Sequence, residues 1–312
     1  MVVLVVGGRG FIGSHLCTYL ARQKHRVIAT TRRLETAPSS NKAIEYRQLD
    51  VLEPSTQDLD FSAVDCVVYL AARTHIIEEV EEDPLAAFRR VNSEAALDLA
   101  RLAAAQGVGR FIYLSSIGVN GISSERAFRE TDPARPLEPY AQSKLEAEQA
   151  LTCCCAASGM QLVVLRPVLV YGRHAPGNFA RLLNAVRAGR ILPVGGFENR
   201  RSLLAVENLV QLIELCMRHP QASDQIFLAA DGDDVSTPEL ARLIGAAIGK
   251  PARLLHLPLG LLRPLARLLG KSRELERLCG SLQVDIGKAR ALLGWKPALS
   301  LREALQRLAD PD

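Results

Sequence analysis

The pattern of apolar positions opens with a short continuous run, and a helical pattern follows it closely. Residues 2–6 are all apolar and mostly β-branched, which is typical of a buried strand. Ile12, Leu16 and Leu20 recur at helical spacing, so a helix begins within the glycine-rich run that follows the strand. The chain therefore starts with a predicted strand, a tight turn and a helix.

The same alternation continues through the first half of the chain. Further apolar runs predict strands over 26–31, 44–51, 65–72, 111–116 and 162–166. Amphipathic patterns predict helices from Pro84 to Gln106 and from Tyr140 to Ala156. Strands that alternate with helices in this way indicate an α/β fold with a doubly wound parallel sheet.

The pattern becomes less regular from about Arg173 onward. Helical patterns over 178–188, 206–218 and 237–248 are separated by short apolar runs. We therefore expect a dinucleotide-binding domain over 1–172 and a smaller C-terminal α/β substrate domain over 173–312. The chain is expected to return to the first domain around 200–230.

Composition narrows the classes of partner. The chain has 312 residues, a net charge of +4 and seven cysteines without a Cys-x-x-Cys pair. The weak positive charge suits an anionic small molecule and does not favour nucleic acid, and the cysteine spacing predicts no metal site. Val2 already belongs to a strand, and we expect no signal peptide, no membrane span and a cytoplasmic location. The leucine-rich basic segment 254–277 is interpreted as a domain surface rather than a membrane anchor.

The glycine run carries the first candidate chemistry. Gly7, Gly10 and Gly13, with Gly8, fit both spacings of the dinucleotide-binding fingerprint. Backbone N–H groups around Phe11 and Ile12, at the positive end of the helix dipole, would hold a pyrophosphate. The alternative is an ordinary corner between a strand and a helix.

The end of the second predicted strand bears on the choice of cofactor. An acidic residue there would hold the ribose 2′-hydroxyl of NAD, but Thr31 occupies the position and Arg32 follows. Arg9 would approach the same corner, and two guanidiniums suit the 2′-phosphate of NADP. We therefore expect NADP, with NAD as the alternative if both arginines are merely solvated.

Two more strand ends are candidates for cofactor contact. Asp50 closes the third predicted strand and could accept the adenine amino group, with Val51 beside it. Ala71 and Ala72 end the fourth strand and are small enough for close approach. Ligands bind at the carboxyl ends of strands in open α/β sheets.

Three further residues form a candidate catalytic set. Tyr140 and Lys144 are four residues apart and share a helix face. We expect the ammonium to lower the pKa of the phenol, so that Tyr140 can exchange a proton with a carbinol oxygen. Ser116, at the tip of the fifth predicted strand, would bind the same oxygen.

Several motifs occur together and in one order along the chain. They are the glycine run, Asp50, Ala71–Ala72, Ser115–Ser116, Tyr140-x-x-x-Lys144, Arg166–Pro167, the run 201–209 and the stretch from Asp285 to Pro297. With these motifs in this order, the chain resembles the extended short-chain dehydrogenase/reductase family. Within that family it is similar to enzymes of the UDP-galactose 4-epimerase and UDP-4-keto-sugar reductase types. The resemblance implies a Rossmann-type sheet, a homodimer, a nucleotide-sugar substrate and cofactor contacts that include Pro167.

The resemblance also implies substrate contacts. Asn178 and Arg201 would lie on the sugar-nucleotide phosphates, and His75 would lie near the sugar. Each has an alternative: Asn178 caps a helix starting at Phe179, Arg201 pairs with a nearby glutamate, and His75 is a plain loop histidine. Asn92 is expected to serve the fold.

The residues after Ser116 narrow the reaction. Sugar 4,6-dehydratases of the family have an acid and a base there, whereas this chain has Ile117 and Gly118, which transfer no proton. The sequence favours a 4-keto-sugar reductase in polysaccharide biosynthesis, with a UDP-hexose 4-epimerase as the alternative. A non-catalytic dinucleotide-binding protein is the remote third possibility.

Overall fold

A computed structural model describes residues 1–34, 43–53, 60–74, 83–258 and 279–308, and also 260, 264, 267, 268, 270 and 275. Its main feature is a seven-stranded parallel sheet of order β10-β6-β5-β4-β1-β2-β3. The strands are β1 (Val2–Val6), β2 (Arg26–Thr31), β3 (Ile44–Gln48), β4 (Cys66–Tyr69), β5 (Arg110–Leu114), β6 (Gln161–Pro167) and β10 (Gln225–Ala229). The sequence prediction of a doubly wound parallel α/β sheet is confirmed.

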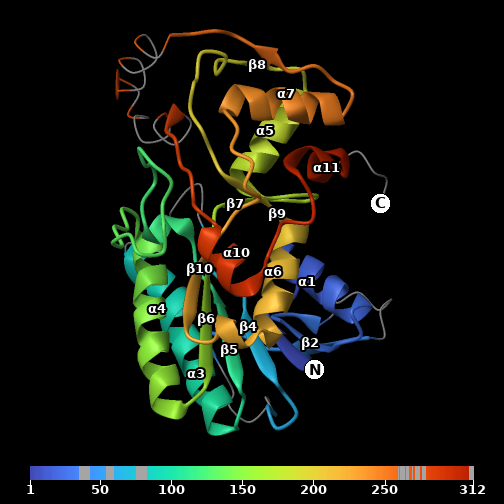
Figure 1. The fold of residues 1–312 in the computed structure, drawn as a ribbon, viewed down its shortest axis with the longest axis vertical. Coiled ribbons are helices and arrows are strands. Elements are labelled where there is room, and N and C mark those ends of the chain that lie inside the picture. The colour runs from blue at the N-terminus through green and yellow to red at the C-terminus, as the bar shows by residue number, and fades with distance from the viewer. Residues whose placement is uncertain are drawn as a thin grey trace.

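Helices cover both faces of this sheet, which explains why its strands are nearly continuous in apolar residues. The helices around the sheet are α1 (Phe11–Arg22), α2 (Pro84–Arg89), α3 (Ala95–Ala105), α4 (Pro139–Ser158), α6 (Val206–Arg218) and α10 (Gly287–Leu293). Alternate residues of β1 serve the two faces: Val3 and Val5 pack with α1 and α6, and Leu4 and Val6 pack with α3. Figure 1 shows α3 and α4 on one side of the sheet and α1 and α6 on the other.

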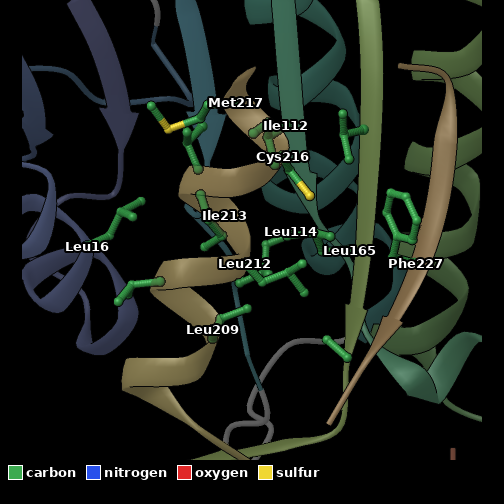
Figure 2. Close-up of a cluster of buried hydrophobic side chains, with 14 of the residues drawn as sticks. Leu16, Ile112, Leu114, Leu165, Leu209, Leu212, Ile213, Cys216, Met217 and Phe227 are labelled. Atoms are coloured by element: carbon green, nitrogen blue, oxygen red, sulfur yellow. The ribbon is translucent and has the colours of Figure 1, made fainter. Parts of the chain in front are cut away.

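The chain returns to the sheet after residue 200, as α6 and β10. Apolar residues of α6, among them Leu209 and Ile213, pack between the sheet and Leu16 of α1 (Figure 2). Strand β10 pairs in parallel with β6 along the sheet edge. Residues 282–295 add Leu293 and Trp295 to the same core. The return around 200–230 is therefore present, while the division of function at residue 172 stays a prediction.

A second, smaller group of elements lies beyond the carboxyl ends of the sheet strands (Figure 1). It consists of β7 (Leu169–Tyr171), β8 (Ile191–Leu192), β9 (Leu203–Ala205), β11 (Arg253–Leu254), α5 (Gly177–Arg187), α7 (Thr237–Ala247) and α11 (Leu301–Gln306). Two short parallel pairs, β7 with β9 and β8 with β11, and a separate apolar core hold the group together.

Asp231 joins the two groups at the start of α6. Its buried carboxylate accepts hydrogen bonds from the backbone N–H of Ala205 (3.0 Å), the amide of Asn208 (2.7 Å) and the hydroxyl of Tyr171 (2.9 Å). A carboxylate at this position also satisfies the positive end of the helix dipole. Burial raises the pKa of Asp231 to about 6, against the effect of these hydrogen bonds.

The helix predicted over 84–106 is interrupted, which corrects the sequence prediction. A π-helical segment, η2 (Arg90–Glu94), separates α2 from α3. Within it, the buried Asn92 side chain accepts from the backbone N–H of Arg73 (2.9 Å) and donates to its carbonyl (3.1 Å). The extra residue in that turn directs Asn92 toward the end of β4, so the expectation that Asn92 serves the fold is confirmed.

Every helix in the described part of the chain is too short or too polar to cross a membrane. More than half of the segment 254–277 lies outside the described residues, so the interpretation of its basic, leucine-rich pattern stays a prediction.

Candidate active site

The glycine run forms the predicted turn between β1 and α1. Gly7 has a φ of +84°, and a Cβ there would lie 2.9 Å from the backbone nitrogen of Ala71. The N–H of Gly10 donates to the carbonyl of Gly7 at 3.0 Å. A Cβ on Gly13 would lie 2.9 Å from the Cα of Gly8 and closer still to the Gly7 carbonyl oxygen. Backbone atoms therefore occupy the space that side chains at Gly7 and Gly13 would need, so the tight turn requires glycine at both positions.

The start of α1 fits a bound pyrophosphate. Its N-cap, Gly10, makes no side-chain cap hydrogen bond, and the first turn holds no acidic residue. The N–H groups of Phe11, Ile12 and Gly13 have no acceptor within the helix because they lie in its first turn. These donors and the helix dipole would hold the phosphates of a dinucleotide.

The other predicted cofactor residues lie around this turn. Ala71 and Ala72 are half-buried after β4, and Pro167 is buried at the end of β6 beside β10. Asp50 is exposed two residues beyond β3, where its carboxylate accepts from the N–H of Leu52 at 3.0 Å. Half-buried Val51 follows it. Contact of these residues with a cofactor stays a prediction.

The basic corner beside the turn contains both predicted arginines in exposed positions. Arg9 and Arg32 follow β1 and β2, which are neighbours in the sheet. Burial raises the pKa of Tyr46 on the next strand, and the charge of Arg9 acts in the opposite direction. The Thr31 hydroxyl forms a hydrogen bond within its own turn, because it donates to the carbonyl of Arg33 at 3.2 Å.

Ser116, Tyr140 and Lys144 come together as the sequence predicted. Tyr140 and Lys144 lie one turn apart on α4, and the side chains of Ser116 and Tyr140 are hydrogen-bonded. The Lys144 Nζ donates to the carbonyl of Leu114 at 2.9 Å and lies 5.9 Å from the centre of the Tyr140 ring. The ring of Tyr113 lies closer to Nζ, at 4.6 Å. A hydroxyl, a phenol and an amine thus meet at the carboxyl end of β5.

The protonation of this set differs from the expectation. Burial raises the pKa of Tyr140 to about 12, and the hydrogen bond with Ser116 lowers it in part. Burial also lowers the pKa of Lys144 to about 7, although Glu148 raises it. The prediction of a lowered phenol pKa is therefore wrong for the protein alone: desolvation outweighs the hydrogen bond with Ser116, and burial also weakens the charge of the lysine that was expected to lower this pKa.

The environment of the phenol ring is apolar on its α2 side. Phe88 of α2 meets the ring of Tyr140 edge to face, with 6.0 Å between the ring centres. On α4 itself, Ser143 accepts from the side chain of Asn92 at 3.0 Å and donates to the carbonyl of Tyr140 at 2.8 Å. These contacts fix the first turn of α4 and therefore the direction of the phenol.

Two of the three predicted substrate residues, Asn178 and Arg201, lie in the described part of the chain. Asn178 is exposed at the second position of α5, which begins at Gly177 after the N-cap Pro176, so the alternative of a cap before Phe179 is wrong. The guanidinium of half-buried Arg201 donates to the carbonyl of Gly280 at 3.0 Å, and burial lowers its pKa. His75 lies outside the described residues. Their roles toward a substrate stay predictions.

The sequence reasoning overlooked Glu148, which is 4% exposed and lies one helical turn beyond Lys144. It forms an ion pair with Arg166, also buried, at 2.5 Å. The signal was available, since a third polar residue continues the four-residue spacing of Tyr140 and Lys144 along an otherwise apolar helix face.

Comparison with known proteins places these features in a family. A model of the NAD dependent epimerase/dehydratase family matches residues 3–230. The chain is 36% identical to a UDP-glucose 4-epimerase of Vibrio cholerae over 310 residues, covering 98% of this chain and 94% of that protein. It is 27% identical to a GDP-6-deoxy-D-mannose reductase of Pseudomonas aeruginosa, covering 98% of this chain and 95% of that one.

A solved structure shares the fold. The UDP-glucuronic acid 4-epimerase of Bacillus cereus in complex with NAD matches with a TM-score of 0.79 and 21% identity, over 98% of this chain and 97% of that one.

Proposed function

Because the chain belongs to the NAD-dependent epimerase/dehydratase family, we propose that it is a 4-epimerase of a UDP-linked hexose. The observation that carries the proposal is the meeting of Ser116, Tyr140 and Lys144 at the carboxyl edge of the sheet, the same edge at which the glycine turn follows β1. The similarity to the Vibrio cholerae protein, which extends over nearly the whole chain, supports the UDP-hexose. The family and this geometry also support a nicotinamide dinucleotide as the cofactor, held by the turn and the start of α1.

Each side chain has a defined task in this reaction. Tyr140 takes the proton of the sugar 4-hydroxyl while the C4 hydrogen leaves with its electron pair, so a 4-keto sugar forms. Tyr140 then returns the proton after the sugar has turned, and the hydride returns to the other face of C4, so no net oxidation occurs. Ser116 donates to the sugar oxygen and Lys144 favours the phenolate. The bound nicotinamide supplies the hydride acceptor and, when oxidised, a positive charge that also favours the phenolate.

The residues after Ser116 support a reaction without dehydration. Ile117 is buried, and Gly118 donates its backbone N–H to the Ser116 oxygen at 3.1 Å. Neither residue can protonate a leaving hydroxyl or remove a proton from carbon, which a 4,6-dehydratase requires.

A reductase of a UDP-linked 4-keto hexose is the second candidate. Arg9 and Arg32 at the ends of β1 and β2 favour a 2′-phosphate, and a consumed reductant is commonly NADPH. In this reaction the hydride moves to C4 and Tyr140 protonates the oxygen once.

The experiment that separates the two reactions measures net redox change. The purified protein is incubated with UDP-glucose or UDP-N-acetylglucosamine without added cofactor, and the product is followed by proton NMR of the sugar. A second reaction contains a UDP-4-keto hexose with NADPH, whose absorbance is recorded. Formation of the 4-epimer by the native protein, and not by Tyr140→Phe, supports the proposal. NADPH consumption matched to product overturns it in favour of the reductase.

The mass of the dinucleotide that copurifies identifies the cofactor, with NAD expected for an epimerase and NADP for a reductase. Sedimentation of the same sample tests the predicted homodimer.

A further inference from the structure

A buried polar network lies directly behind the three candidate catalytic groups. The Glu148 carboxylate accepts from the Nε of Arg166 at 2.9 Å and from its Nη2 at 2.5 Å. Ser115 donates its hydroxyl to the same carboxylate in a short hydrogen bond. The Nη1 of Arg166 donates to the side-chain oxygen of Asn120 at 3.0 Å. All four residues are at most 5% exposed, so this is an ion pair removed from water with its hydrogen-bonding groups engaged.

The network is connected to both halves of the site. On α4, Glu148 continues the series of Tyr140 and Lys144 at intervals of four residues, which places the three side chains along one helix face. Directly after β5, Ser115 precedes Ser116 in the chain, and its backbone N–H donates to the carbonyl of Leu165 at 2.7 Å. The carboxylate therefore ties the end of β5 to α4, and it fixes how Ser116 faces the phenol.

The charge of the network acts on the amine. Lys144 is 2% exposed, and among the described residues its amine lies near the rings of Tyr113 on β5 and Tyr140 on α4 and is acted on by the charge of Glu148 on α4. Arg166 on β6 is linked to this group of residues by its hydrogen bond to Glu148. Burial lowers the pKa of Lys144 to about 7, and the carboxylate of Glu148 opposes this effect.

Two ion pairs involving the helices packed against α4 lie in more exposed positions. Arg89 of α2 pairs with Glu146 at 2.6 Å, and both side chains are partly exposed to solvent. Asp98 and Arg101 of α3 pair with each other at 3.3 Å in exposed positions. Water screens such pairs far more than it screens the buried pair.

We propose that Glu148 and Arg166 are a positioning pair, which orients Ser116 and sets the charge of Lys144 for the reaction proposed above. The inference depends on that proposed function, because it assigns the pair to the same proton transfer. Stability alone does not call for such a pair, because replacing a buried ion pair with apolar residues of similar size is often neutral or stabilising.

The test uses two substitutions that break the same contact with opposite changes of charge. Glu148→Gln removes a negative charge near Lys144, whereas Arg166→Gln leaves the negative charge of Glu148 uncompensated. Lysine Cε is labelled with 13C, the protonation of Lys144 is followed by NMR against pH, and Lys144→Met assigns the signal. We expect the midpoint to fall by about one pH unit in Glu148→Gln and to rise by about as much in Arg166→Gln, roughly a tenfold change in proton affinity each way.

Two further variants separate charge from structure. Ser115→Ala breaks a hydrogen bond to Glu148 without changing charge, so its midpoint should stay within about 0.3 units of the native value, a twofold change. Glu148→Asp keeps the charge and should restore the midpoint. The proposal is overturned if the two charge variants have equal Lys144 midpoints, or if both midpoints shift in the same direction. A pair with a purely structural role would not shift the two midpoints in opposite directions.

This titration needs neither substrate nor turnover, so it is separable from the proposed function. If the opposite shifts appear while no UDP-hexose is converted, the proposed function fails and the assignment of the amine's charge stands. Where conversion is observed, the alkaline limb of kcat should move in the same two directions. If the alkaline limb of the pH profile of kcat stays unchanged in both variants, the positioning role is overturned, even when the titration midpoint of the amine shifts.

Discussion

Replacing Gly13 with alanine tests the turn that we assign to the cofactor. The added Cβ would lie 2.9 Å from the Cα of Gly8 and closer still to the carbonyl oxygen of Gly7, whereas ordinary contact begins near 3.4 Å. Both neighbours are backbone atoms, and the Gly7 carbonyl also accepts the hydrogen bond from Gly10. The first turn of α1 must therefore move away from the loop by about 1 Å, because the contact with the Gly7 oxygen is the tighter of the two.

Two opposing terms act on stability. Overpacking in a tight site costs about 1–3 kcal/mol, and alanine in a helix regains about 1 kcal/mol relative to glycine. The net loss in the free energy of unfolding is thus about 0–2 kcal/mol, and urea denaturation should show a folded variant. Binding is the more sensitive quantity. Losing one charge-assisted hydrogen bond to a phosphate costs about 1.5–3 kcal/mol, or roughly a 10- to 150-fold rise in Kd.

Isothermal titration with NAD and with NADP measures this rise, and Gly109→Ala is the matched control. A Cβ on Gly109 would meet its nearest neighbour, the carbonyl oxygen of Asp65, at a comfortable 3.8 Å. We expect the control to bind like the native protein. If Gly13→Ala binds both dinucleotides within twofold of the native Kd, the pyrophosphate does not lie on this turn and the reasoning is refuted.

Three further outcomes follow from the structure. Tyr140→Phe should reduce kcat at least about a hundredfold, because it removes the group that exchanges the proton, while the Kd for the dinucleotide changes less than threefold in the same titration. Replacing Arg9 and Arg32 together with alanine should weaken NADP and leave NAD unchanged, and equal loss for both would contradict a 2′-phosphate contact. The pKa of Asp231 is raised from 3.8 to about 6, so the folded state holds its proton more tightly than the unfolded state does. The free energy of unfolding should therefore fall by up to about 3 kcal/mol between pH 4 and pH 6, and urea denaturation of Asp231→Asn should lack this part of the fall.

The elements that the sequence predicted well are those with one strong local cause. Strand β2 and helix α6 match the predicted ranges 26–31 and 206–218, because their apolar periodicity is uninterrupted. The glycine turn was predictable because few other local structures need glycine at three positions with this spacing. The joint position of Tyr140 and Lys144 followed from helix geometry alone.

The failures required information from distant parts of the chain. The π-helical turn at Asn92 depends on the backbone of Arg73, which a helical pattern does not contain. The pKa of Tyr140 depends on how much protein surrounds the phenol, so a spacing rule based on the neighbouring lysine gave the wrong sign. The spacing of Glu148 along helix α4 is visible in the sequence, but its ion pair depends on Arg166 of strand β6, which that spacing does not contain.

The way β10 closes the sheet has a practical consequence for dissecting this chain. A fragment cut after residue 172 would retain β6 but lose the strand that pairs with it through residues 225–229. An unprotected, strongly apolar strand edge invites pairing between copies, and the same cut would also uncover the sheet face that α6 protects. The dinucleotide-binding half should therefore precipitate when produced by itself, so the chain has to be studied in one piece.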